Sequence, residues 1–398
     1  MASPGSVLIV VENLPIPFDR RVWMEATALV DAGYDVATIS VTGKGFEREF
    51  EVIEGIRNYR HDLGTEGHSA FTYLAEYAKA LWAEVRLARR AYDDRPFDVI
   101  HICNPPDLMF LWAAWYKLRH GVKVIFDQHD INPELYEAKY DKRDVFYALL
   151  RLAERCTFLT ANVVITTGES YRAIALTRGR KKSEDVFIVR SAPDLAKFQP
   201  VEPIAAYRQG RRFLVGYVGV MGPQEGLDYL LRAVRIVVTE LGRTDISFVL
   251  IGSGPSYEAL RVLARELGVA DYVEFTGRVP DDELIERLST CDVCVNPDPY
   301  NPFNDASVMN KILEYMALRR PVVQFDLTEG RLSAGAASAY ARPNDVHDLA
   351  KTIVAVLDDG ERRAEMGREG YRRMRDELEW RHQVPTLLRA YDRALRRA

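Results

Sequence analysis

Short apolar runs recur along the chain and alternate with longer segments in which apolar residues repeat every three or four positions. The short runs predict buried parallel strands, and the periodic segments predict amphipathic helices. Predicted strands cover residues 7–11, 36–41, 97–103, 122–126, 163–166, 186–189, 213–218, 247–251, 272–276 and 293–295, and another opens at 322. Because strands and helices alternate throughout, we predict an α/β fold with doubly wound parallel sheets.

Three helical segments shape the predicted organisation. They are a long amphipathic helix over 71–92, a helix over 136–161 with interleaved aromatic and basic residues, and an arginine-rich segment over 361–398. A chain of 398 residues is too long for one ordinary core. Proline and polar residues up to Pro203 indicate a linker. We therefore place one domain at 1–200, a second at 201–375 and a final helix at 376–398.

Composition narrows the class and the compartment. Hydrophobic residues make up 47% and charged residues 28%, as in globular proteins, and the net charge of -5 argues against a nucleic-acid partner. No apolar run approaches the roughly 18–20 residues of a membrane span, and the N-terminus does not resemble a signal peptide. Four cysteines in this length suggest reduced thiols and a cytoplasmic location. Cys291 and Cys294 lack a second ligand pair, so we expect buried structural thiols.

The stretch 292–324, DVCVNPDPYNPFNDASVMNKILEYMALRRPVVQ, concentrates the chemistry. A predicted strand ends in a polar loop, and Ser307 or Asn304 is positioned to cap the helix that follows. Ligands of open α/β sheets bind at the carboxyl ends of strands, and helix N-termini favour anions. Lys311 and Glu314 lie three apart on this helix, and their spacing alone fits a surface ion pair equally well.

The phrase S-x-x-N-K-x-x-E-Y-M-A, followed by R-P-V-V, resembles the donor-site signature of family 4 (group 1) glycosyltransferases. The resemblance continues through GVMGPQEG at 219–226, GSGP at 252–255 and TGRVP at 276–280, and it covers nearly the whole chain. It implies the GT-B fold, in which two Rossmann-like domains face each other across a cleft and the final helix crosses back to the N-terminal domain. It also implies retaining, metal-independent transfer from a nucleotide-diphosphate sugar, with no cofactor, to a saccharide, lipid-linked or small-molecule acceptor.

The resemblance also assigns roles. It implies that Glu314 holds the donor ribose and that His129, in the sequence D-Q-H-D, faces the transferred sugar. Counting back from Glu314, the family's first glutamate falls on Ala306, which passes the sugar contact to Asp305. The candidate catalytic residues are therefore His129, Asp305 and Lys311. The candidate donor-binding residues are Gly219, Met221, Gly222, Gly254, Arg278, Asn304, Ser307, Asn310, Lys311 and Glu314.

Charge near the donor phosphates is the open question. Arg20, Arg21 and Asp130 are candidates for the phosphate or acceptor side, although Arg21 and Arg278 fit solvated positions equally well. Glu225 stands where the family usually has a lysine, and a glutamate cannot neutralise a diphosphate. A catalytically impaired nucleotide-sugar-binding or partner-binding protein therefore stays an alternative, and a nucleotide-sugar epimerase a more distant one. The arginine-rich C-terminal segment allows peripheral contact with the inner face of the membrane.

Overall fold

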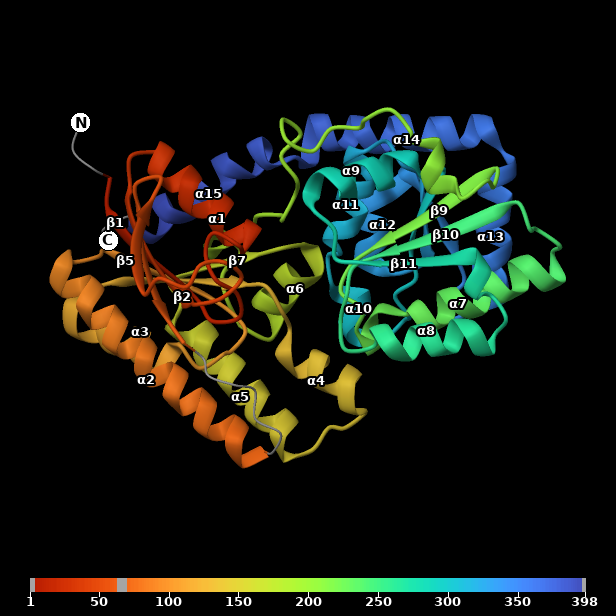
Figure 1. Ribbon diagram of the computed structural model, residues 1–398. Coiled ribbons are helices and arrows are strands. Elements are labelled where there is room, and N and C mark those ends of the chain that lie inside the picture. Colours follow the sequence, from red (N-terminus) through yellow and green to blue (C-terminus); the bar gives the residue numbers. More distant parts are fainter. Residues whose placement is uncertain (1–3, 63–69, 396–398) are drawn as a thin grey trace. The chain divides into compact units, whose positions relative to one another are not determined.

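The computed structural model describes residues 4–62 and 70–395, which form two compact units (Figure 1). Unit 1 comprises the chain up to Arg190 together with the segment from Gln383 onward, and unit 2 comprises Ser191–His382. The sequence-based boundaries lie after residues 200 and 375.

Unit 1 is built on a sheet that has eight strands within the described ranges, in the order β3-β4-β2-β1-β5-β6-β7-β8. The strands are β1 (Ser6–Val11), β2 (Asp35–Val41), β3 (Phe50–Ile53), β4 (Ile56–His61), β5 (Val99–Cys103), β6 (Lys123–Gln128), β7 (Val163–Thr166) and β8 (Val186–Ile188). The helices are α1 (Arg20–Asp31), α2 (Ala70–Asp94), α3 (Phe110–His120), α4 (Asn132–Tyr140), α5 (Val145–Thr160), α6 (Glu169–Thr177) and α15 (Trp380–Leu395). All pairings are parallel except β3 with β4. Strands β1 and β5 are buried at every position, which explains their continuous apolar sequence.

Unit 2 contains a parallel sheet with six described strands in the order β11-β10-β9-β12-β13-β14. The strands are β9 (Phe213–Val218), β10 (Ile246–Ile251), β11 (Val273–Gly277), β12 (Val293–Asn296), β13 (Val322–Phe325) and β14 (Ser338–Ala341). The helices are α7 (Leu227–Arg235), α8 (Tyr257–Glu266), α9 (Asp281–Thr290), α10 (Pro302–Ala306), α11 (Asn310–Ala317), α12 (Thr328–Ala334), α13 (Val346–Asp358) and α14 (Gly360–Arg373). Cys291 and Cys294 are both fully buried in this core, as expected for structural thiols. The doubly wound α/β prediction is confirmed in both units.

The predicted helix over 136–161 is wrong, because the structure contains two helices there. Helix α4 ends at Tyr140, and Asp141 adopts a left-handed conformation with φ 51°. Helix α5 then starts after Asp144, whose side chain accepts hydrogen bonds from the amides of Phe146 and Tyr147. The charged run D-K-R-D at 141–144 thus ends one helix and caps the next, and apolar periodicity on both sides hid the break.

The hairpin of β3 and β4 was not predicted. Strand β3 is short and half exposed, so its sequence lacks a continuous apolar run. Its two-residue turn places both Glu54 (φ 51°) and Gly55 (φ 82°) in the left-handed region. Such turns are usually signalled by Asn-Gly or Asp-Gly, and a glutamate in the first position conceals the signal.

The C-terminal segment is helical, as predicted, but it divides between the units. Helix α14 continues into a π-helical turn, Met374–Leu378, and α15 follows. In Figure 1 the blue α15 lies beside the red α1 and β1, and the Tyr391 and Tyr34 ring centroids are 5.6 Å apart. Over the described ranges, no helix has the length and apolar character needed to cross a bilayer.

Candidate functional site

The first polar cluster, here called the histidine site, consists of Arg21, Glu25, His101, Asp127 and His129 in unit 1. Asp127 occupies the carboxyl end of β6 and is fully buried. Arg21, in the first turn of α1, binds it with both arms: Nε donates to Oδ2 at 2.9 Å and Nη2 to Oδ1 at 2.7 Å. This fork geometry is the strongest form of arginine–carboxylate contact.

Arg21 is held from three sides, so its guanidinium serves the interior of unit 1. Besides binding Asp127, Nη1 donates to the carbonyl oxygen of Val189 at 2.8 Å, and Nη2 lies 3.1 Å from Glu25 Oε1. Helix α1 is fixed at this end because Asp19 accepts a hydrogen bond from the Val22 amide. The solvated alternative for Arg21 is therefore wrong, since the residue is only 7% exposed. Arg20, the adjacent candidate, is exposed.

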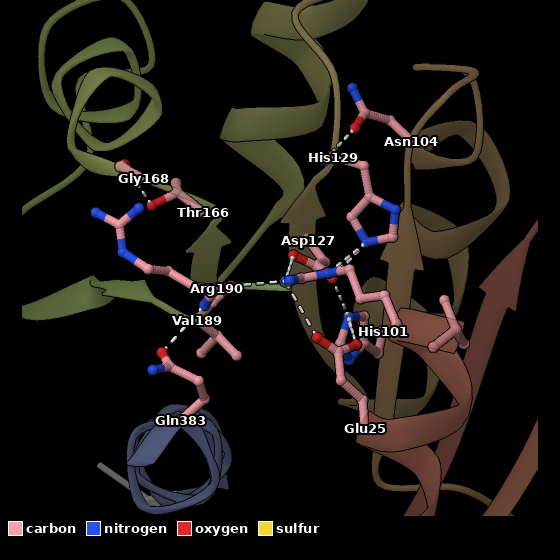
Figure 2. A network of polar contacts seen from close by, with 12 residues as sticks. Glu25, His101, Asn104, Asp127, His129, Thr166, Gly168, Val189, Arg190 and Gln383 are labelled. Carbon is pink, nitrogen blue, oxygen red and sulfur yellow. Dashed lines mark hydrogen bonds and ion pairs between the residues drawn. The ribbon is translucent and has the colours of Figure 1, made fainter. Parts of the chain in front are cut away.

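His129 lies directly beyond this ion pair. Its Nε2 is 2.6 Å from Asp127 Oδ2, its side chain is 13% exposed, and its backbone amide donates to Asn104 Oδ1 at 2.8 Å. Figure 2 shows Asp127 between the rings of His101 and His129, with Glu25 approaching from α1. The ring of His129 is thus the least buried side chain in a cluster whose other members are buried from solvent.

The protonation states of this cluster follow from burial and charge. Burial by itself raises the pKa of Asp127, but Arg21 and His129 outweigh it and hold that pKa well below its usual range. Burial raises the pKa of Glu25 well above its usual range and lowers the pKa of His101. Burial thus favours the neutral forms of Glu25 and His101, whereas Arg21 favours the charged form of Asp127.

Helix α15 contacts the histidine site and the nearby Arg190. His101 Nδ1 lies 2.6 Å from the hydroxyl of Tyr391 on α15. Gln383, at the start of α15, accepts a hydrogen bond from the Arg190 amide at 3.1 Å, as Figure 2 shows. The chain leaves unit 1 after Arg190 and returns at Gln383, so this hydrogen bond links the residues at which the chain leaves and re-enters unit 1.

Sequence reasoning assigned no role to Asn104, which fixes the loop that carries His129. Its Oδ1 also accepts from the Asp130 amide at 3.2 Å, and its Nδ2 donates to the Asp130 carbonyl at 2.8 Å. Asp130 is half-buried, and burial raises the pKa of its carboxyl group. The signal was available in the N-P-P-D sequence that follows β5, where Asn104 and Asp107 are both buried.

His101, Cys103 and Asp127 place one potential metal-ligating atom each within 4.8 Å of one another. Both oxygens of Asp127 already bind Arg21, whose positive charge opposes a cation. Burial also raises the pKa of the Cys103 thiol well above its usual range. The donor set is thus poorly suited to a metal ion.

The second cluster, here called the lysine site, consists of Tyr217, Glu225, Asp298 and Lys311 in unit 2. Lys311 Nζ lies 2.7 Å from Glu225 Oε2, 3.0 Å from Asp298 Oδ1 and 5.0 Å from the Tyr217 ring centroid. The surface-pair alternative for Lys311 and Glu314 is therefore wrong, because Lys311 is only 8% exposed and pairs elsewhere. Glu314 is half-buried one turn further along α11.

The acidic partners of Lys311 differ in exposure. Asp298 is fully buried, and burial raises its pKa to about 6 although Lys311 acts in the opposite direction. The Glu225 side chain is 16% exposed. Burial by itself lowers the pKa of Lys311, but Asp298, Tyr217 and Glu225 raise it well above its usual range. Glu225, the departure from the family pattern, thus pairs with the very lysine that the pattern assigns to the donor.

The glycine-rich loop after β9 is fixed against the loop after β10. The Gly219 amide donates to the Ile251 carbonyl and the Met221 amide to the Ser253 carbonyl, both at 3.1 Å. Both amides are therefore used within unit 2. At Gly254, a Cβ atom would lie 2.7 Å from the Met221 amide nitrogen, so the two turns interlock too closely for any side chain.

Gly226 allows the equally close approach of the loop after β12. It has φ 63°, and a Cβ atom there would lie 2.0 Å from the Pro297 carbonyl oxygen. The approach places Asp298 beside the short helical turn Pro223–Glu225, and it thereby assembles the lysine site.

The predicted helix caps are wrong for α11, which begins after Met309 without a side-chain cap. Asn301 instead caps α10, accepting from the Asn304 amide at 2.9 Å, while Asn304 Nδ2 donates to the carbonyls of Gln224 and Pro299. Ser307 Oγ donates to the Phe303 carbonyl at 2.7 Å.

Asp305 already binds another residue of unit 2. Its Oδ1 accepts from the Thr328 amide at 2.8 Å and its Oδ2 from the Thr328 hydroxyl at 3.0 Å, at the start of α12. Of three further candidates in unit 2, Gly222 is buried, whereas Arg278 and Asn310 are exposed.

Tyr315 escaped sequence reasoning although it lies in the motif. Its hydroxyl accepts from the Val218 amide at 2.9 Å and lies 3.2 Å from the Val295 carbonyl. This contact fixes α11 against the carboxyl ends of β9 and β12.

Two family models match the chain: "Glycosyl transferase 4-like domain" over residues 19–190 and "Glycosyl transferases group 1" over residues 212–359. A 2-deoxystreptamine glucosyltransferase of Streptomyces kanamyceticus is 26% identical, covering 80% of this chain and 82% of that protein. An uncharacterised glycosyltransferase of Methanocaldococcus jannaschii is 36% identical, covering 75% and 73%. The solved sucrose-phosphate synthase of Thermosynechococcus elongatus matches with a TM-score of 0.79 at 18% identity, covering 97% and 98%. That likeness shows a shared fold.

Proposed function

Because the chain belongs to the group 1 glycosyltransferases of family 4, retaining GT-B enzymes that use nucleotide sugars, we propose that its lysine site receives the donor diphosphate. The carrying observation is the position of Lys311. It is a buried cation at the carboxyl edge of the unit 2 sheet, beside the glycine-rich loop and one turn before Glu314. In our proposal, Glu314 binds the donor ribose, and Lys311 exchanges Glu225 for a phosphate oxygen.

Exchange of this kind is physically reasonable. Glu225 is the partly exposed partner of Lys311, so it can turn toward water while the buried Asp298 stays in place. Lysine is a point charge without fixed hydrogen-bond directions, so it changes partners with little geometric cost. Lys311 would then stabilise the charge that develops on the leaving diphosphate.

For the transferred sugar we propose contact with His129, whose ring is the least buried part of the histidine site. Asp305 would take part only after releasing Thr328, so we give it the smaller role. Arg20 is the better candidate for a phosphate contact, because Arg21 is committed to Asp127 and Val189. We further propose that catalysis requires no metal and takes place in the cytoplasm.

The acceptor is proposed from the named relative. The Streptomyces kanamyceticus enzyme acts, by its name, on 2-deoxystreptamine, so aminocyclitols come first in an acceptor panel. Saccharides and lipid-linked sugars, including those of cell-surface polysaccharide synthesis, follow.

The donor proposal is tested by thermal unfolding with UDP-, GDP-, TDP- and ADP-glucose in the presence of EDTA. Binding to the native state raises the midpoint by an amount set by ligand concentration over the dissociation constant. A rise with one nucleotide, lost in Glu314→Ala but kept in the matched exposed variant Glu258→Ala, would support the site. No rise with any nucleotide at millimolar concentration would overturn it.

A second candidate is a nucleotide-sugar-binding protein without turnover. Two observations favour it: Glu225 neutralises Lys311, and Thr328 occupies Asp305. Nucleotide binding without product, in radiolabelled transfer assays over the full acceptor panel, would favour this candidate. Product formation would exclude it.

We also propose peripheral contact with anionic lipid through a hollow beside α14. The hollow has a volume of about 810 Å³ and is lined by Arg319, Ala336, Arg362, Glu365, Met366, Arg368, Glu369, Tyr371, Arg372 and Arg375. Five arginines face two glutamates there, which favours anions. Co-sedimentation with anionic but not neutral vesicles, reversed by salt and weakened in Arg362→Glu/Arg368→Glu, is the expected result. Equal binding to both vesicle types would contradict it.

A further inference from the structure

We propose that Asp127 and Arg21 are positioning residues that hold His129 as its Nε2–H tautomer, leaving Nδ1 as a hydrogen-bond acceptor for a hydroxyl of the bound sugar. The proposal deepens the role given to His129 above and rests on it for the identity of the ligand. The tautomer itself follows from contacts within unit 1.

The contact between His129 and Asp127 decides which ring nitrogen of His129 carries the hydrogen. Their closest atoms, Nε2 and Oδ2, are 2.6 Å apart. Asp127 is ionised, because Arg21 binds both of its oxygens in a buried environment. A carboxylate has only lone pairs to offer, so a stable contact at this distance requires a hydrogen on Nε2.

Arg21 also approaches the His129 ring, because its Nε lies 3.0 Å from His129 Nε2. That distance alone would fit Nε2 as an acceptor and the opposite tautomer. Arginine keeps all its protons, and its Nε–H has a better acceptor in the charged Oδ2 of Asp127 at 2.9 Å. Both N–H groups therefore point at the same carboxylate oxygen.

The other ring nitrogen of His129, Nδ1, is left for the ligand. All side-chain hydrogen bonds that His129 makes within the described ranges run to Nε2. In the neutral ring, Nδ1 then carries a lone pair, which selects a donor such as a sugar hydroxyl. Because Asn104 fixes the His129 backbone and Asp127 fixes its ring, the acceptor is oriented before substrate arrives.

Arg21 has a separate part in this arrangement. It is anchored to the Val189 carbonyl as well as to Asp127, so the carboxylate cannot rotate toward another partner. Lysine would keep the charge but lose the two-pronged contact. Arg21→Lys should therefore loosen His129 without leaving Asp127 unpaired.

The test is NMR of ¹⁵N-histidine-labelled full-length protein, in which long-range ¹H–¹⁵N correlations distinguish the two neutral tautomers. His129→Gln assigns the signal. We expect the Nε2–H pattern in the wild type and the Nδ1–H pattern in Asp127→Asn, because an amide can donate to Nε2. An Nδ1–H pattern in the wild type would overturn the proposal, whether or not Asp127→Asn folds.

Kinetics supply the second readout. Asp127→Asn should lower kcat by about 10²–10⁴-fold, as loss of the correct tautomer does in serine proteases, with donor affinity changed less than about threefold. Arg21→Lys should lower kcat about tenfold and broaden the His129 signal. Unchanged kcat in Asp127→Asn with a changed tautomer would count against the sugar contact alone, while the positioning pair would stand.

A matched control is available in the same unit. Glu51 pairs with the buried Arg60 at 2.6 Å, away from His129. Glu51→Gln also replaces a carboxylate by an amide in a buried arginine pair, and it should leave the His129 tautomer and kcat unchanged. If it changed both, the effects in Asp127→Asn would have to be read as general loosening of unit 1, and the proposal would fall.

Discussion

The histidine site and the lysine site each bury a cation against carboxyl groups, but they do so differently. In unit 1, Arg21 binds Asp127 with two parallel hydrogen bonds, and burial raises the pKa of the second carboxyl group, Glu25, well above its usual range. In unit 2, the single Nζ of Lys311 contacts both oxygens of Asp298 and one oxygen of Glu225, and Glu225 is partly exposed.

The two arrangements suit different tasks. A two-pronged arginine pair with balanced charge is rigid, so it suits the orientation of a neighbouring ring such as His129. A lysine with one exchangeable partner suits a site whose ligand is itself an anion.

Arg21→Met and Lys311→Met both remove the cation and leave buried carboxyl groups behind. Arg21→Met should lower the free energy of unfolding by about 3–5 kcal/mol, because Asp127 is left charged and buried. Lys311→Met should cost less, about 1–3 kcal/mol, because Glu225 can turn to water and Asp298 can take a proton. Urea unfolding followed by circular dichroism measures both. An equal or larger loss in Lys311→Met would contradict the distinction between a rigid arginine pair and an exchangeable lysine pair.

Gly226→Ala should disrupt the lysine site through the backbone. The added Cβ atom would overlap the Pro297 carbonyl. We therefore expect the free energy of unfolding to fall by about 3 kcal/mol and nucleotide binding to be lost. Gly242 is the control, since it has φ 67° but a Cβ atom there would meet no atom of the described chain within 4 Å beyond its immediate neighbours. Gly242→Ala should lower the free energy of unfolding by only about 1–2 kcal/mol, the strain of an alanine in the left-handed region. Equal losses would show that conformation alone, and not the close approach, explains Gly226.

The pH dependence of stability isolates Asp298. Its folded pKa of about 6 lies above the ordinary 3.8, so the folded state holds this proton more tightly than the unfolded state. The contribution of Asp298 to the free energy of unfolding therefore falls as the pH rises from about 4 to about 6. Between about pH 4 and pH 7, the wild type should lose about 2 kcal/mol more than Asp298→Asn. Parallel curves for the two proteins would contradict the assignment.

Glu225→Gln should strengthen donor binding, because Lys311 no longer has to release a carboxylate. We expect the dissociation constant to fall about tenfold, equivalent to ~1.4 kcal/mol, in isothermal titration calorimetry. Glu274, paired with Arg287 at 2.9 Å elsewhere in unit 2, supplies the matched control Glu274→Gln, which should bind as the wild type does. Weaker binding in Glu225→Gln would mean that Glu225 supports the donor site.

Much of the fold was predictable because buried parallel strands carry a local signal. The strands at 163–166 and 213–218 were placed to the residue, since continuous apolar runs appear where both sheet faces are covered. The hairpin of β3 and β4 gave no such signal, being half exposed and turning at Glu54. The break after Tyr140 was missed for a similar reason, as its capping residues are simply polar.

The candidate residues themselves were also visible in the sequence, because His129, Lys311 and Glu314 lie in recognisable phrases at strand ends. Local sequence patterns were therefore enough to predict the fold class, the family and the residue types available for chemistry. The partners were decided by tertiary structure alone: Arg21 meets Asp127 across 106 positions, and Lys311 meets Glu225 across 86. Local patterns report burial and helix ends, whereas an ion pair between distant segments exists only once the sheet brings its strand ends together.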